Sequence, residues 1–335
     1  MTDFAPWWAL RNRHLQSILP SLPWQRRRTA RRAAGLLAAS RELLLDCGAG
    51  VRLQAFQAEP LLADGGSPPA QSQAIKAPDL AVLLHGWEGS ATAPYVLSLG
   101  QHLFDAGIAV VRLNLRDHGD THHLNRGLFH SCLLPEVVNA VSELRRLNPG
   151  RRLWLIGFSL GGNFMLRVAA SPAGAALQLA GVIAVSPVLD PANTLRALER
   201  GLPLYRRYFV WKWSRSLARK QAIWPQDHNF SSLLRVADLR RMTAELVARY
   251  TDFPHIDDYL EGYAITGERL ATLHAPALVL TSRDDPIIPV GDLERLARHP
   301  LLEVRITDHG GHTGFVERLG APSWVNEFIR RRLLP

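Results

Sequence analysis

The chain has 335 residues, of which 47% are hydrophobic and 21% are charged. That balance supports a sizeable hydrophobic core and excludes a largely disordered chain. The formal net charge is +9 at pH 7. The arginines are nevertheless scattered, apart from one cluster at Gln25–Arg32, and no nucleic-acid-binding motif accompanies them. We therefore expect no nucleic-acid partner.

The cysteine usage and the N-terminus bear on the compartment. Cys47 and Cys132 have neither the spacing of a zinc site nor that of a disulfide framework. The segment Met1–Leu10 lacks the basic start and apolar run of a signal peptide. No apolar run approaches the roughly 18–20 residues that a bilayer-spanning helix needs. These features predict a soluble, cytoplasmic protein.

The first 73 residues predict three different kinds of structure. Residues 1–40 are rich in Trp and Arg without a regular pattern, so we expect an irregular arm packed on the main body. Arg41–Phe56 contains two β-type runs around Cys47–Gly50, which predicts a hairpin. Ala63–Gln73 is rich in Gly, Pro and Ser and predicts an exposed loop.

From Asp79 onward, apolar strand-like runs alternate with helical patterns. The predicted strands are Asp79–Gly86, Ile108–Leu115, Arg152–Gly157, Gly181–Pro187, Ala277–Ser282 and Leu302–Asp308. The predicted helices between and after them are Pro94–Gly107, Pro135–Leu147, Leu160–Ala170, Gly291–His299 and Ser323–Leu333. Such an alternation favours right-handed crossovers and a mainly parallel sheet with helices on its faces.

The alternation stops at Asp190–Leu270, where helical runs are dense in Trp, Tyr and Arg. We expect residues 1–190 and 271–335 to form one α/β core and residues 191–270 to form a helical cap inserted between two late strands. An insertion at this place usually covers the end of the sheet where ligands bind.

One serine stands between glycines where a predicted strand meets a predicted helix. Gly157-Phe158-Ser159-Leu160-Gly161 fits the pattern G-x-S-x-G. Glycines at Gly157 and Gly161 allow a turn sharp enough to raise the serine hydroxyl above the sheet. The helix N-terminus beside it favours developing negative charge. We interpret Ser159 as a catalytic nucleophile.

A serine nucleophile needs a base, and the base needs an orienting acid. In this topology the acid and then the histidine follow later strands. Asp284 and Asp285 follow one such strand, and His309 and His312 follow the next. We favour Asp285, because the prolines after it stiffen its loop, with Asp284 as the alternative. We favour His312 over His309, because Gly310-Gly311 lets the loop approach the serine.

The oxyanion of the reaction needs two positioned N–H donors. We assign the backbone N–H of Leu160, directly after the nucleophile, and that of Trp87, in the turn after the strand Asp79–Gly86. Gly86 permits this turn, and His85 is expected to hold it by side-chain hydrogen bonds.

The loop Arg116–Ser131 is unusually rich in Asp and His. A metal site is one interpretation, but no recognised ligand spacing is present. We expect Arg116 and its neighbours to form a polar network that supports the loops around the site, with no metal and no cofactor required.

Several of these motifs, taken together, resemble those of a known protein family. The stretches HGWEGS, NLRDHGD, GFSLGGN, DDPIIP and GGHTGF resemble the α/β-hydrolase superfamily with its Ser–Asp–His order. Arg11–Leu22 and HGWEGSATAPYV resemble elements of the YheT-like hydrolases, bacterial relatives of the mammalian ABHD1/ABHD3 group. One departure is Asp117, which stands where the group commonly has a glycine.

The resemblance implies an α/β-hydrolase fold and a carboxylic-ester hydrolase acting on short- or medium-chain acyl esters or on acylglycerol-type lipids. It assigns the triad to Ser159, Asp285 and His312. Acyltransferase or thioesterase chemistry on the same triad remains an alternative. Another is a catalytically silent binding protein that uses its basic N-terminal arm. Peripheral membrane contact through Trp7, Trp8, Trp24 and the arginine cluster is a further hypothesis, with packing of those tryptophans against the core as its alternative.

Overall fold

The computed structural model describes residues 4–60 and 79–334, so the predicted loop at residues 63–73 lies outside the described part. Its centre is one sheet with the strand order β1-β2-β4-β3-β5-β6-β7-β8. The strands are β1 Ser40–Asp46, β2 Arg52–Ala58, β3 Leu80–Leu84, β4 Ala109–Leu113, β5 Leu153–Phe158, β6 Leu179–Val185, β7 Ala277–Ser282 and β8 Leu302–Thr307.

Six of the strands run parallel, as the alternation predicts. β1 and β2 form the predicted antiparallel hairpin, and β2 joins the sheet antiparallel to β4. From β4 to β8 every pairing is parallel. All residues of β3, β4 and β5 are buried, because helices cover both faces of these strands. The parallel strands therefore present their carboxyl ends along one edge.

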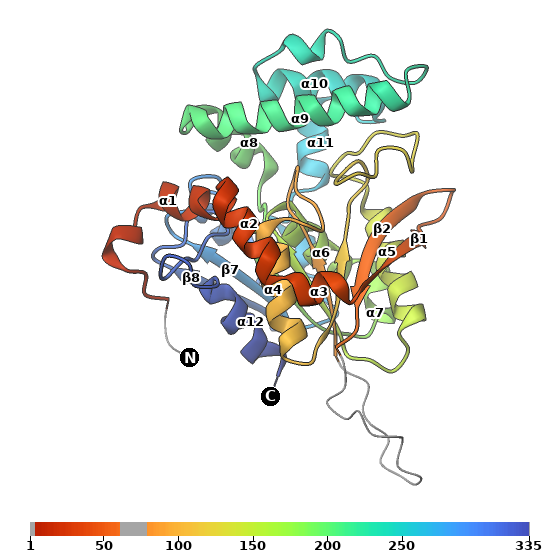
Figure 1. Cartoon of the computed structure of the whole chain (residues 1–335). Helices are drawn as coiled ribbons and strands as arrows, with labels where there is room; N and C mark the ends of the chain where they lie inside the picture. Colours follow the sequence, from red (N-terminus) through yellow and green to blue (C-terminus); the bar gives the residue numbers. More distant parts are fainter. Residues whose placement is uncertain (1–3, 61–78, 335) are drawn as a thin grey trace.

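Helices pack on both faces of the sheet (Figure 1). One face is covered by α4 Pro94–Asp105 and α12 Trp324–Leu333, which share a hydrophobic cluster that includes Leu36. The other face is covered by α5 Leu134–Leu147 and α6 Leu160–Ala170, with the short α7 Pro172–Ala176 after them. The predicted α/β architecture is confirmed.

The N-terminal segment is more regular than its composition suggested. It contains the 3-10 helices η1 Trp8–Leu10 and η2 Leu19–Ser21 and the α-helices α1 Arg13–Ile18, α2 Pro23–Arg32 and α3 Ala34–Ala38. The expectation of an irregular arm is therefore wrong. Asn12 caps α1 by accepting hydrogen bonds from the backbones of His14 and Leu15, and Pro23 opens α2.

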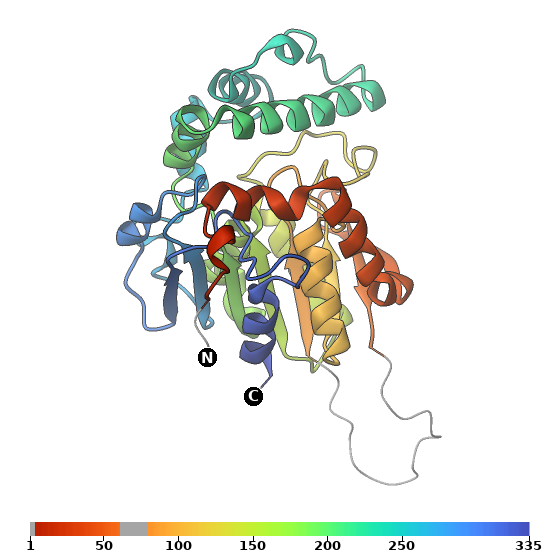
Figure 2. The ribbon, with the colours of Figure 1, turned by 60° about the vertical axis from the view of Figure 1, so that its left-hand side comes forward.

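The helices between β6 and β7 lie above the carboxyl ends of the strands in both views (Figures 1 and 2). They are α8 Pro191–Arg200, α9 Pro203–Ile223, α10 Leu239–Tyr250 and α11 Ile256–Gly262, with the 3-10 turns η3 Leu233–Arg235 and η4 Glu268–Leu270. Part of this layer has its own small hydrophobic cluster around Phe230 and Met242. Nowhere in the described ranges does a helix combine the length and the apolar character that crossing a bilayer requires.

The predicted helix at Gly291–His299 is a second correction. The segment forms only the 3-10 helix η5 Val290–Arg295. An α-helix would need the carbonyl of Arg295 for its own next turn, but that oxygen accepts from the backbone of Gly267 at 2.7 Å. Leu296 then pairs with Gly267 as an isolated parallel bridge. A long-range backbone contact thus replaces the local helical one.

Candidate active site

Ser159 sits on a strained turn between β5 and α6. Its backbone angles, φ 53° and ψ −121°, lie where residues other than glycine are uncommon. The turn is tight enough that a Cβ at Gly157 would collide with the backbone of Gly161. A Cβ at Gly161 would collide with the carbonyl oxygens of Leu84 and His85. The glycines of the motif are thus required by the close approach of β5, α6 and the end of β3.

His312 and Asp285 are in direct contact. His312 Nδ1 lies 2.9 Å from Asp285 Oδ2, and the carboxylate side chain has no exposed surface. The other carboxylate oxygen accepts from the backbone N–H groups of Ile287 and Ile288 at 2.8 and 3.0 Å. The loop that leaves β7 therefore holds the carboxylate in one orientation, and that carboxylate orients the imidazole.

The two alternative residues form a separate pair. Asp284 accepts from the backbone of Gly311 at 2.9 Å, and its other oxygen lies 3.6 Å from His309 Nδ1. Asp284 thereby fixes the loop that carries His312. The geometry brings Asp285 together with His312, and Asp284 together with His309.

Ser159 and His312 line one cavity of about 310 Å³. Its walls come from the turn after β3, from the N-terminal helices and from α9. Among the described residues no hydrogen bond joins the Ser159 hydroxyl to His312. Hydrogen bonds of this kind are often long or unformed in sites without bound substrate.

A smaller cavity of about 110 Å³ adjoins the first one. Both are lined by Trp87, Val188 and Leu198. The smaller cavity is enclosed mainly by apolar and aromatic side chains from α8, α10 and α11, and Leu160 closes it on the side of the serine. Both cavities are lined mainly by apolar surface, and only the larger one reaches Ser159 and His312. We call the smaller one the apolar chamber.

The two predicted oxyanion donors have free N–H groups. Within residues 4–60 and 79–334, nothing accepts from the backbone N–H of Trp87 or of Leu160. Leu160 is the first residue of α6, where the helix leaves its N–H groups without intrahelical acceptors. The turn that carries Trp87 closes through a 2.9 Å hydrogen bond from Gly89 to the carbonyl of Gly86, whose own N–H donates to the Tyr95 hydroxyl at 3.0 Å.

His85 ties this turn to the neighbouring strand. Its Nε2 accepts from the backbone of Leu115 at 3.3 Å, so Nδ1 carries the proton that it donates to the carbonyl of Gly86 at 2.7 Å. Burial, followed by the nearby His118, holds the pKa of His85 well below its ordinary value. A neutral imidazole with a fixed tautomer thus connects the ends of β3 and β4.

Helix α9 contacts the turn after β3 from above. The Trp87 ring stacks on Phe209 with 5.2 Å between centroids and meets Trp213 edge-on at 5.1 Å. Lys212 donates to the carbonyl of Glu88 at 2.5 Å. Burial raises the pKa of the Glu88 carboxyl to about 7, with Lys212 opposing that shift. The position of the turn that carries Trp87 therefore depends on the helical layer above it.

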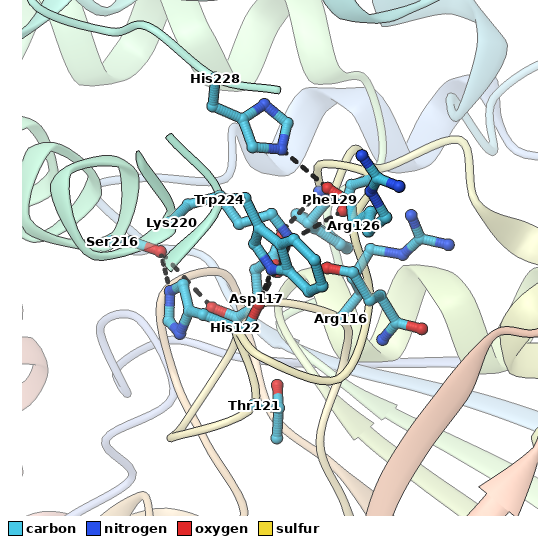
Figure 3. Close-up of polar contacts among 12 residues, drawn as sticks. Arg116, Asp117, Thr121, His122, Arg126, Phe129, Ser216, Lys220, Trp224 and His228 are labelled. Carbon is cyan, nitrogen blue, oxygen red and sulfur yellow. Dashed lines mark hydrogen bonds and ion pairs between the residues drawn. The ribbon is translucent and has the colours of Figure 1, made fainter. Parts of the chain in front are cut away.

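The Asp- and His-rich loop is a polar network, which Figure 3 shows in close-up. Arg116 pairs with Glu136 of α5 through two buried hydrogen bonds. Asp117 Oδ1 accepts from Lys220 of α9 at 2.8 Å, and Oδ2 accepts from the backbone of Phe129. Lys220 also donates to the carbonyls of Asn125 and Gly127 of the same loop.

Three further side chains of the helical layer contact this loop (Figure 3). Trp224 donates to the carbonyl of His122, the ring of His228 contacts the carbonyl of Arg126, and Ser216 meets the ring of His122 at 2.8 Å. Burial lowers the pKa of His122 to about 3. No cluster of three or more potential metal ligands occurs in the described ranges.

Three residues that hold the loops and helices around the candidate site were not predicted from the sequence. Ser17 accepts from the backbone N–H of His312 at 2.9 Å, across 295 positions. Asn163 bridges α6 to the carbonyls of Val188 and Tyr263. Lys220 is the third, and the sequence did offer a signal for it: only three of the 39 basic residues are lysines, so a lysine at this position stands out. A lysine ammonium can donate to several carbonyls at once from a compact centre, which a planar guanidinium cannot do in the same space.

Comparison with known proteins places these features in a wider group. A model described as "Alpha/beta hydrolase family" matches residues 81–327. The chain is 28% identical to YheT of Escherichia coli (strain K12), over 74% of this chain and 73% of that protein. It is 24% identical to the medium-chain fatty acid ethyl ester synthase/esterase 2 of Saccharomyces cerevisiae, over 75% and 60%. It is 22% identical to the phospholipase ABHD3 of mouse, over 70% and 58%.

The chain thus spans less than two thirds of the two eukaryotic relatives. Among solved structures, the Pyrococcus furiosus esterase Pf2001 superposes with a TM-score of 0.53 at 15% identity, over 87% of this chain and 90% of that one. The serine hydrolase CCSP0084 of Cycloclasticus superposes with a TM-score of 0.56 at 14% identity, over 87% and 96%. At these identities the structural likeness concerns the fold.

Proposed function

Since the chain belongs to the alpha/beta hydrolase family, we propose that it is a serine carboxylic-ester hydrolase with the triad Ser159, His312 and Asp285. The observation that carries the proposal is the 2.9 Å contact between His312 and the buried Asp285, at a cavity that Ser159 also lines. A histidine held by a buried carboxylate beside a strained serine is the arrangement that nucleophilic acyl transfer requires.

The proposed reaction begins at the Ser159 hydroxyl. With its Nδ1 engaged by Asp285, His312 has Nε2 left to take the proton as Ser159 attacks the ester carbonyl. The oxyanion is stabilised by the free N–H groups of Trp87 and Leu160. His312 then gives the proton to the departing alcohol, and a water activated by His312 releases the acid from the acyl-enzyme. These steps require no metal and no organic cofactor.

The two cavities suggest how an ester would lie. We infer that residues 191–270 act as a cap and that the acyl chain enters the apolar chamber beneath it, next to Leu160. The alcohol portion would occupy the larger cavity and leave through its mouth. A chamber of about 110 Å³ suits a short or medium acyl chain. The printed names of the yeast and mouse relatives, an ethyl ester synthase/esterase and a phospholipase, agree with acyl esters as the substrate class.

The proposal is tested with p-nitrophenyl esters of graded chain length. Ser159→Ala should fold normally but lose about 10³-fold or more in turnover, because the nucleophile is absent while the oxyanion donors remain. Ser171→Ala, at the other end of α6, is the matched control and should keep wild-type turnover. Retained turnover in Ser159→Ala, with thermal unfolding unchanged in both variants, would exclude this nucleophile.

A further inference from the structure

The mouth of the larger cavity is bordered by two segments that are distant in the sequence. Ser17, Leu22 and Arg26 of the N-terminal helices line one side, and Leu204 and Tyr208 of α9 line the other. The views of Figures 1 and 2 agree that α1 and α2 lie beneath α9, and His14 of α1 contacts the Tyr205 hydroxyl of α9 at 3.0 Å. We call residues 11–32 and 201–223 together the mouth rim.

The mouth rim carries a single sign of charge. Residues 11–32 contain seven arginines, and residues 201–223 contain four arginines and two lysines. Two of these, Arg219 and the buried Lys220, pair with Asp120 and Asp117 and are not counted toward the charge of the rim. Neither segment contains an aspartate or a glutamate. In the chain as a whole, 39 basic residues are balanced by 30 acidic ones. The positive potential of the molecule is therefore concentrated around the entrance of the candidate active site.

Large apolar side chains are exposed on the same rim. Trp24 of α2 is 50% exposed, and Leu204 and Trp211 of α9 are 52% and 53% exposed. Leu15 and Tyr208 are exposed beside them. About half of the Trp24 side chain is therefore open to solvent. Single exposed apolar residues are ordinary on a protein surface, but Leu204 and Tyr208 line the cavity itself. The other three lie on the same helices, α1, α2 and α9, where arginines are frequent. Arg215, for instance, lies 5.0 Å over the Trp211 ring.

We propose that the mouth rim docks on the surface of an anionic lipid bilayer. Tryptophan and tyrosine rings settle at the level of the headgroups, and arginines nearby gain from the negative surface potential. Arg26 from one segment and Tyr208 from the other line the opening itself, so docking of the mouth rim would bring that opening against the lipid. Entry of an ester from the bilayer into the cavity rests on the proposed function, whereas docking itself does not.

Docking is measured by flotation with Ser159→Ala protein, so that the result does not depend on hydrolysis. Vesicles of phosphatidylcholine with about one third phosphatidylglycerol should bind the protein at about 0.1 M salt, and pure phosphatidylcholine should bind it far less. Binding should weaken strongly toward about 1 M salt, where the screening length falls to roughly 3 Å.

A charge variant locates the docking surface. Arg27, Arg31 and Arg207 belong to the mouth rim, and all three are exposed. Changing these three to Gln should weaken vesicle binding on the order of 100-fold, since each basic residue near such a surface contributes about 1 kcal/mol. The matched control changes Arg41, Arg52 and Arg298 to Gln, which removes the same charge away from the mouth. Trp24→Ser should weaken binding further without altering thermal unfolding.

Several outcomes would overturn the proposal. One is absence of vesicle binding at low salt. Another is equal weakening in the two triple variants, which would show a general charge effect. A third is tight, salt-sensitive binding of duplex DNA together with indifference to vesicles, which would assign the rim to nucleic acid. A protein that docks on vesicles but lacks esterase activity would leave this inference standing and remove the proposed function instead.

Discussion

Asp284 and Asp285 are adjacent in the sequence, yet they serve different partners. Asp285 orients the ring of His312, whereas Asp284 holds the backbone of Gly311. The sequence favoured Asp285 but kept Asp284 as an alternative, because both carboxylates follow the end of the same strand. The distinction depends on which of them faces the histidine loop after β8, and that is set by the turn Asp285–Ile288 with its two backbone hydrogen bonds.

The pair allows a test with one chemical change at two neighbouring positions. Asp285→Asn should lower kcat by about 10³- to 10⁴-fold, because an amide favours the wrong tautomer of the histidine. Asp284→Asn should lower kcat by less than about tenfold, since an amide oxygen can still accept from Gly311. Steady-state kinetics on a short acyl ester measures both. A larger loss of kcat in Asp284→Asn than in Asp285→Asn would show that Asp284 is the acid that orients His312.

The site residues that could be predicted from the sequence are marked by their immediate neighbours in the chain. The residues that were missed are defined by contacts with distant parts of the chain. Ser159 is marked by its glycines, and the spacing of Gly310-Gly311 favours His312 over His309. Ser17 supports His312 from the opposite end of the chain, and nothing in its own neighbourhood signals that contact. Hydrogen bonds across hundreds of positions follow only from the assembled fold.

At the scale of elements, α9 contacts two of the loops around the site. Its middle packs Phe209, Lys212 and Trp213 on the turn that carries Trp87. Near its C-terminal end, Lys220 enters the loop that follows β4. Lys220 is fully buried, and its partner Asp117 adopts a φ of 57°, which a non-glycine residue rarely does. The departure from the usual glycine at position 117 is thus explained by a carboxylate partner for the buried lysine.

Breaking this buried pair should be costly. Lys220→Met should lower the free energy of unfolding by about 3–5 kcal/mol, because it leaves Asp117 buried without its counter-charge. Adding Asp117→Asn should restore a large part of that loss. Urea unfolding measures both variants. The control is Arg219→Met, which removes an exposed pair with Asp120 and should change stability by less than about 1 kcal/mol. Equal losses at the two positions would show that the buried pair does not anchor α9.

The two wrong element predictions have physical reasons at this scale as well. Residues 8–38 contain several helices, and the longest of them, α2, has no fully buried residue, so hydrophobic periodicity could not reveal it. The segment after Pro289 has a helical pattern, but its last turn is taken up by the bridge to Gly267. Hydrophobic periodicity thus fails to predict secondary structure where a helix has no buried face or where a tertiary contact determines the backbone conformation.

For the whole molecule, the sheet and its covering helices were predictable because burial on both faces requires continuous apolar strands. β3, β4 and β5 show this directly. The sequence also placed the insertion between β6 and β7, and parallel topology then sets it near the carboxyl ends of the strands. The concentration of charge around the cavity mouth was not predictable, since it joins two segments some 170 or more positions apart.

The central claim is that Ser159 is an activated nucleophile, and covalent labelling with a fluorophosphonate tests it most directly. The account predicts one adduct per chain, located by mass spectrometry on Ser159. It also predicts much slower labelling in His312→Ala, and none after heat denaturation. An adduct on another residue, or labelling of Ser159→Ala as fast as the wild type, would contradict it.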